Sequence, residues 1–99
     1  MIFYVRITTD KNETYFFSVD DISIEHAEAQ VNMICYYMFA RHPSKVFVKD
    51  DNSGLSARTK EILSKYRVAI SNETLIIRGS MLDHERYIEL KYNLALDIT

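Results

Sequence analysis

Three histidines and one cysteine are the residues of this chain best suited to bind a metal or attack a substrate. The histidines, His26, His42 and His84, lie far apart, and none has a second histidine or a cysteine at a metal-ligand spacing. The run from Asp83 to Arg86 combines acid, base and cation, but adjacent helical positions point about 100° apart, so we interpret it as a charged first turn. The sequence therefore predicts no metal, no cofactor and no local catalytic motif. An enzyme whose active site is assembled from distant residues stays open.

Cys35 lies in the most apolar stretch of the chain, residues 33–40. A nucleophilic thiol needs a nearby base and access to solvent, so this setting favours a core position over a catalytic one. One cysteine allows no intramolecular disulfide, and the alternating start of the chain does not resemble a signal peptide. No segment approaches the roughly 20 apolar residues of a membrane span. We therefore expect a cytoplasmic protein with no membrane association.

Aromatic and basic residues are expected to share one face of the first strands. If Phe3, Val5 and Ile7 face the core, strand alternation directs their neighbours to the opposite face. The same rule, applied to residues 14–19 and 45–49, completes a set of six: Tyr4, Arg6, Phe16, Lys45, Phe47 and Lys49. Such a set is typical of surfaces that bind single-stranded nucleic acid. The competing interpretation is that a helix covers this face and the aromatics are packing residues.

The segment 23–41 is apolar on more sides than one packed face can bury. Its core stripe has three-and-four spacing and comprises Ile24, Ala27, Val31, Ile34, Cys35 and Met38, while Met33, Tyr36, Tyr37 and Phe39 occupy other faces. Either this helix is central and contacted on two sides, or its outer side is a protein interface. The interface hypothesis names Met33 and Tyr37, one turn apart, extended by His26 and Gln30 toward Glu25 and Glu28, which would steer a basic partner.

The elements that must position these residues follow from local patterns. Segments 2–8 and 14–19 predict a β-hairpin, and Ser23 is a candidate N-cap for a helix over 23–41 that Pro43 closes. Further patterns predict a strand over 45–49, a helix over about 55–66, and a second hairpin formed by 67–70 and 74–78. We therefore expect one α+β domain spanning residues 1–99, with a mainly antiparallel sheet packed by a long central helix and one or two further helices.

The tail from Ser80 to Thr99 supports two interpretations. Ser80 and Asp83 resemble a helix start, and leucine, glutamate, lysine and alanine favour a helix. Apolar residues alternate from Ile88 to Ile98, however, with the period of a half-buried strand. We favour the helix because the intervening residues are poor strand formers, but the choice between helix and strand stays open.

Composition narrows the function classes without selecting one. The chain has 99 residues and a formal net charge of −2, which lacks the basic excess of a general DNA binder. Two glycines exclude a glycine-rich phosphate loop. Residues with A/T-rich codons, such as Ile, Tyr and Lys, outnumber Gly, Ala, Arg and Pro, as in many bacteriophages and mobile elements but also in ordinary A/T-rich bacteria. We therefore favour a small non-catalytic protein-binding module that regulates or inhibits another macromolecule, such as a host protein, with homodimerisation as a further hypothesis.

Overall fold

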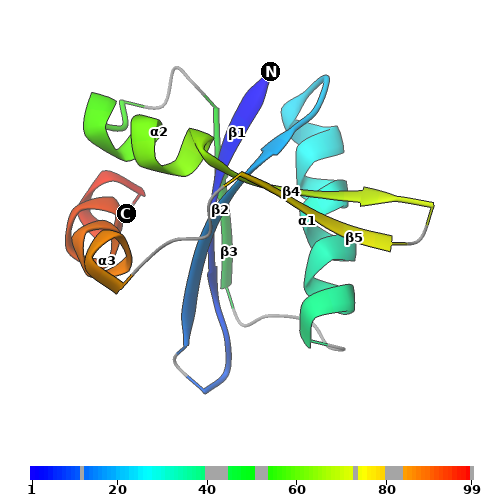
Figure 1. Ribbon diagram of the computed structural model, residues 1–99, viewed down its shortest axis with the longest axis horizontal. Helices are drawn as coiled ribbons and strands as arrows, with labels where there is room; N and C mark the ends of the chain where they lie inside the picture. The colour runs from blue at the N-terminus through cyan, green and yellow to red at the C-terminus, as the bar shows by residue number, and fades with distance from the viewer. Residues whose placement is uncertain (12, 40–44, 51–53, 73, 80–83, 99) are drawn as a thin grey trace.

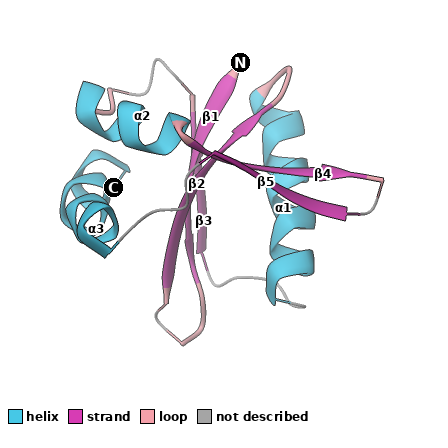
Figure 2. Cartoon of the chain, in the orientation of Figure 1, coloured by secondary structure: helices cyan, strands magenta, loops and turns pink. Residues whose placement is uncertain are grey.

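The protein folds into a five-stranded sheet with helices on both faces (Figures 1 and 2). The computed structural model describes residues 1–11, 13–39, 45–50, 54–72, 74–79 and 84–98, with side chains described up to Tyr37 in the first helix and up to Lys91 in the last. The strands are β1 (Ile2–Thr8), β2 (Thr14–Asp20), β3 (Lys45–Lys49), β4 (Tyr66–Ser71) and β5 (Thr74–Gly79). The helices are α1 (Ile24–Phe39), α2 (Ala57–Ser64) and α3 (His84–Ile98). The predicted α+β class and mainly antiparallel sheet are confirmed.

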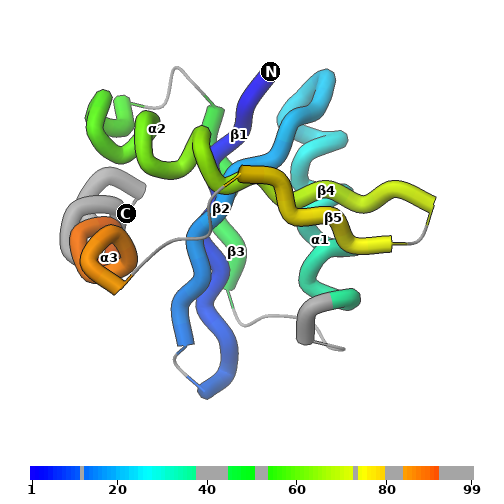
Figure 3. Tube along the Cα trace, viewed as in Figure 1, coloured from blue at the N-terminus to red at the C-terminus, as the bar shows by residue number. Residues whose placement is uncertain are grey.

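The strand order is β3-β1-β2-β4-β5, and every neighbouring pair is antiparallel except β2 and β4. Figure 3 shows how the chain leaves the first hairpin, runs along α1 and returns in β3 beside β1. Both predicted hairpins are present. Asn72, in the second turn, has a φ of 50°, a conformation that asparagine tolerates better than most residues.

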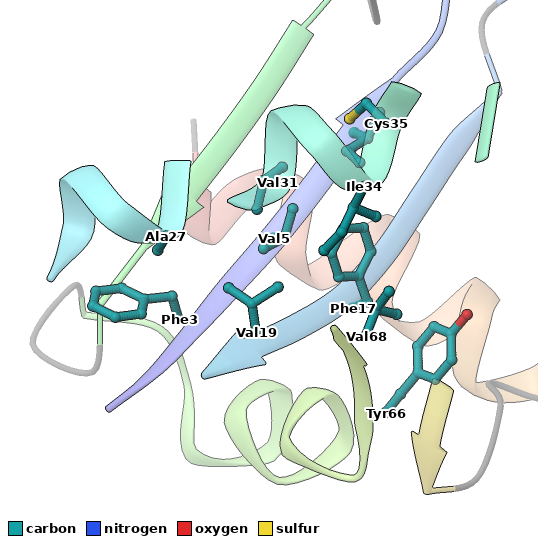
Figure 4. Close-up of a cluster of buried hydrophobic side chains, with 11 residues drawn as sticks. Phe3, Val5, Phe17, Val19, Ala27, Val31, Ile34, Cys35, Tyr66 and Val68 are labelled. Carbon is teal, nitrogen blue, oxygen red and sulfur yellow. The ribbon is translucent and has the colours of Figure 1, made fainter. Parts of the chain in front are cut away.

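One face of the sheet packs against α1. Strand alternation brings Phe3, Val5 and Ile7 of β1 to this face together with Phe17 and Val19 of β2. The stripe on α1 meets them through Ala27, Val31, Ile34 and Cys35, all of which are buried (Figure 4). The predicted core side of this helix is therefore confirmed for the residues described, while the side chain of Met38 lies outside them.

The opposite face is covered by α2 and α3. Ser56 caps α2, because its hydroxyl oxygen accepts a hydrogen bond from the backbone N–H of Thr59 at 3.2 Å. Helix α2 buries Ile62 and Leu63 against Tyr4 and Phe16, and α3 adds Leu90 to the same cluster. The tail is thus a helix rather than a strand from His84 onward; its expected start at Ser80 to Asp83 lies outside the described residues.

The second helix is shorter than expected. It ends at Ser64, and Tyr66, which the sequence placed in the helix, begins β4. The end of β5 passes close to the residue between α2 and β4. Gly79 has a φ of +90°, and a Cβ atom there would collide with the carbonyl oxygen of Lys65. Among the described helices, none is long and apolar enough to cross a membrane.

Candidate functional site

Among the helical side chains that the structure describes, the large exposed apolar ones lie on the outer side of α1. Met33, Tyr36 and Tyr37 are 50%, 65% and 41% exposed. On the opposite side of the same helix, Val31 and Ile34 are completely buried. Nothing in the described part of the chain covers the outer side, which in Figure 1 points away from the sheet and from the other two helices. Helix α1 is therefore the long central helix expected from the sequence, but within the described residues only its inner side is packed.

Four residues form a continuous strip on this side, which we call the α1 strip: Ala29, Met33, Tyr36 and Tyr37. Spacings of three and four residues place them in successive turns of one face. The rings of Tyr36 and Tyr37 meet edge to face, with centroids 6.0 Å apart and planes at 88°. This geometry is favoured between aromatic rings, so each tyrosine helps to hold the other in place.

Sequence reasoning missed Ala29 as a member of the strip and left Tyr36 out of the proposed interface. The signal was present, because Ala29, Met33 and Tyr37 share a spacing of four residues.

The first turns of α1 flank the strip with charge. Glu25, His26 and Glu28 are all exposed, as the interface hypothesis requires. Ser23 caps the helix, since its hydroxyl oxygen accepts from the N–H of His26 at 3.3 Å, and the same hydroxyl lies 2.8 Å from Nδ1 of His26. The His26 ring is therefore held close to the helix start, beside the two carboxylates.

The side chain of Gln30 makes hydrogen bonds within the chain. Its side-chain Nε2 donates to the carbonyl oxygen of Asp20 at 3.2 Å and to Oδ2 of Asp21 at 2.8 Å. These bonds tie α1 to the end of β2. Gln30 is half-buried and its amide is engaged within the chain, so its place in the interface stays a prediction.

A half-open, mainly apolar hollow of about 580 Å³ lies near the start of α1. Its lining includes Met1, Ile2 and Phe3 of the first strand region and Ile22, Ile24 and Glu25 around the helix start. The exposed side chain of Ile22 stands at its rim. Through Glu25, the hollow adjoins the charged end of the α1 strip.

The aromatic and basic face expected on the first strands is not an open surface. Tyr4 and Phe16 are only 4% and 2% exposed, because α2 and α3 cover them, and the Phe16 ring lies 5.8 Å from that of Tyr87. Arg6 is also buried and its guanidinium carbon lies 4.3 Å from the ring centroid of Phe47. The prediction of a stacking platform on these residues is therefore wrong. Lys45 is exposed, and Phe47 and Lys49 are half-buried on the edge strand β3.

The described residues that could attack a substrate or bind a metal do not lie together. Burial raises the pKa of the Cys35 thiol to about 11, which keeps it protonated and unreactive. His26 and His84 lie on the exposed surfaces of different helices, and His42 and Asp83 are outside the described residues. Within the described ranges, no group of three histidine, cysteine or acidic side chains is placed to hold a metal ion.

Comparison of the chain with protein-family models, with curated proteins and with solved structures finds no match.

Proposed function

We propose that this chain is a non-catalytic protein-binding module that regulates or inhibits another macromolecule through the α1 strip. The observation that carries the proposal is the contrast between the two sides of α1, one completely buried and the other exposing a methionine and two tyrosines. Methionine and tyrosine are over-represented at protein interfaces, since one adapts its shape and the other combines apolar area with a hydroxyl.

The partner expected for this surface is a protein with an apolar contact region and basic residues beside it. Glu25 and Glu28 lie next to the strip, and their charge would accelerate encounter with a basic partner at low ionic strength. The surplus of residue types that A/T-rich codons encode adds the proposal of a phage or mobile-element protein that acts on a host protein in the cytoplasm. Homodimerisation through the same strip is the alternative that the experiment must separate.

The test uses a double variant in which both Met33 and Tyr37 are replaced by serine. Because both side chains are exposed, the variant should keep its circular dichroism spectrum and melt close to the wild type. It should lose the ability to capture a protein partner from a host lysate. A matched control changes exposed Lys11 and Lys91 to serine, and this variant should retain capture.

Sedimentation of the same proteins identifies the kind of partner. A monomeric wild type that captures a partner supports a heterologous complex. A wild-type dimer that the double change converts to a monomer supports self-association through the strip. A folded double variant that keeps both its oligomeric state and its partners would contradict the proposal.

A further inference from the structure

The second hairpin ends in strand β5, which lies at one edge of the sheet. Strand β5 pairs with β4 over six residues, from Tyr66–Gly79 to Ser71–Thr74. No described strand pairs with its other edge. Alternate residues of such an edge direct their N–H and C=O groups outward, where an added strand can bind them.

The two faces of this edge differ in chemistry. Leu75 and Ile77 share the face that turns toward α1, where Leu75 packs on the core and Ile77 is 43% exposed. Thr74, Ile76 and Arg78 share the other face. An added strand would therefore meet three apolar side chains in succession and then a cation.

Arg78 lies directly opposite Arg67 of β4, and both are exposed. Like charges at directly opposed positions of an antiparallel pair destabilise it. Arg67 Nε donates to the carbonyl oxygen of Ser64 at 3.1 Å, which fixes its guanidinium beside the end of α2. Neither arginine has an acidic partner in the part of the chain that is described.

A hollow of about 250 Å³ lies at this arginine pair. Its lining consists of Ser64, Lys65, Arg67, Arg78 and Gly79. Lys65 is already paired with Glu61, at 3.5 Å, whereas the two arginines leave positive charge uncompensated at the same place. A carboxylate in this hollow would relieve the repulsion between them.

We propose that the free edge of β5 binds an extended acidic segment of a partner protein as a sixth, antiparallel strand. The segment would place an aspartate or glutamate opposite Arg78, followed toward its C-terminus by three apolar residues opposite Ile77, Ile76 and Leu75. A second copy of this chain fits less well, since β5 contains no acidic residue that could face Arg78 of its partner. The site is separate from the α1 strip and does not depend on the function proposed there.

The probe is a blocked seven-residue peptide in which a glutamate is followed by three valines and a threonine, with a serine at each end. Two control peptides replace the glutamate with lysine or the middle valine with proline. Titration into ¹⁵N-labelled full-length protein at low salt should shift the β5 amides with the first peptide. The lysine peptide should bind about fivefold more weakly or worse, and the proline peptide should not bind, because it cannot complete a strand.

Two protein variants complete the test. Arg78→Glu removes the repulsion with Arg67, so it should remain folded and lose the preference for the acidic peptide. Lys11→Glu makes the same charge change at an exposed position in the turn between β1 and β2, and it should keep that preference.

Three results would overturn the proposal. They are no β5 shift with any peptide at millimolar concentration, equal binding of all three peptides, and concentration-dependent β5 shifts without peptide, which would assign the edge to a second copy. Preferential binding of the acidic peptide that is lost in the Arg78 variant alone would support it.

Discussion

Arg58 of α2 and Glu89 of α3 form a forked pair, with Nε 2.9 Å from Oε1 and Nη2 3.4 Å from Oε2. This ion pair links the two helices that cover Tyr4 and Phe16. The hydrogen bond from Arg58 lowers the pKa of Glu89 below its ordinary value of 4.5. The carboxylate form is thus favoured in the folded state.

The first prediction concerns acid stability. Because the pKa of Glu89 is lower in the folded than in the unfolded state, its contribution is complete above pH 4.5 and is lost as the pH falls through the folded value. Glu89→Gln should therefore melt at a lower temperature than wild type at pH 7, and the difference should shrink toward pH 3. Thermal melts at several pH values check this, and the difference should also shrink in high salt since the pair is exposed. A difference that is constant with pH would show that the pair does not contribute.

The second prediction compares adjacent residues of α1. Ile34→Ala should reduce the free energy of unfolding by about 2–5 kcal/mol, because it removes a fully buried side chain and leaves a cavity. Met33→Ala should change it by less than about 0.5 kcal/mol, since Met33 is exposed. Urea denaturation of both variants measures the two values, and similar losses for both would mean that the helix buries a different side.

The third prediction compares the two glycines. Gly54→Ala should cost about 1–2 kcal/mol, because Gly54 has a φ of +84° but open space around it. Gly79→Ala should cost more, since the new methyl group would also meet the carbonyl oxygen of Lys65. Denaturant midpoints rank the variants, and equal costs would refute the close approach of Gly79 to Lys65.

The fourth prediction concerns the thiol. With its pKa raised to about 11, Cys35 should react with a disulfide reagent at pH 8 at least about 100-fold more slowly than the unfolded chain. The rate in the folded protein should rise with denaturant, as opening of the structure limits the reaction. Rapid labelling without denaturant would place Cys35 at the surface.

Short-range sequence patterns predicted the helices and strands well, because the spacing of apolar residues within a segment decides which regular structure can bury them. The three-and-four spacing of Val31, Ile34 and Cys35 specifies the core side of α1, and alternation in residues 2–8 specifies two faces of β1. Alternation does not say which face is covered, since Tyr4 and Phe16 are aromatic, as Phe3 and Phe17 are. The helices that cover them come from residues 57–64 and 84–98, and no short-range pattern links these segments to β1.

In the candidate sites too, short-range patterns predicted some features, while others depend on contacts between distant segments. Exposure of Met33 and Tyr37 followed from a surplus of apolar residues on one helix. The hydrogen bonds of the Gln30 side chain could not be predicted in this way, because they depend on how Asp20 and Asp21 are placed before α1. The opposition of Arg67 and Arg78 likewise required the register of the hairpin.

Strands β2 and β4 join the two hairpins into one sheet, and we call this junction the seam. Their parallel pairing is recorded at Ser18 and Arg67, and the buried Ser18 hydroxyl lies within hydrogen-bonding distance of two carbonyl oxygens, 2.7 Å from that of Leu63 and 3.0 Å from that of Tyr66. Ser18 and Tyr66 are 48 residues apart in sequence, whereas each hairpin closes through a short turn. Because closing the long loop costs more chain entropy, we expect the two hairpins to form first and to join last. Ser18→Ala should accordingly accelerate unfolding while leaving the folding rate nearly unchanged, and stopped-flow measurements that showed slower folding instead would place the seam in the nucleus.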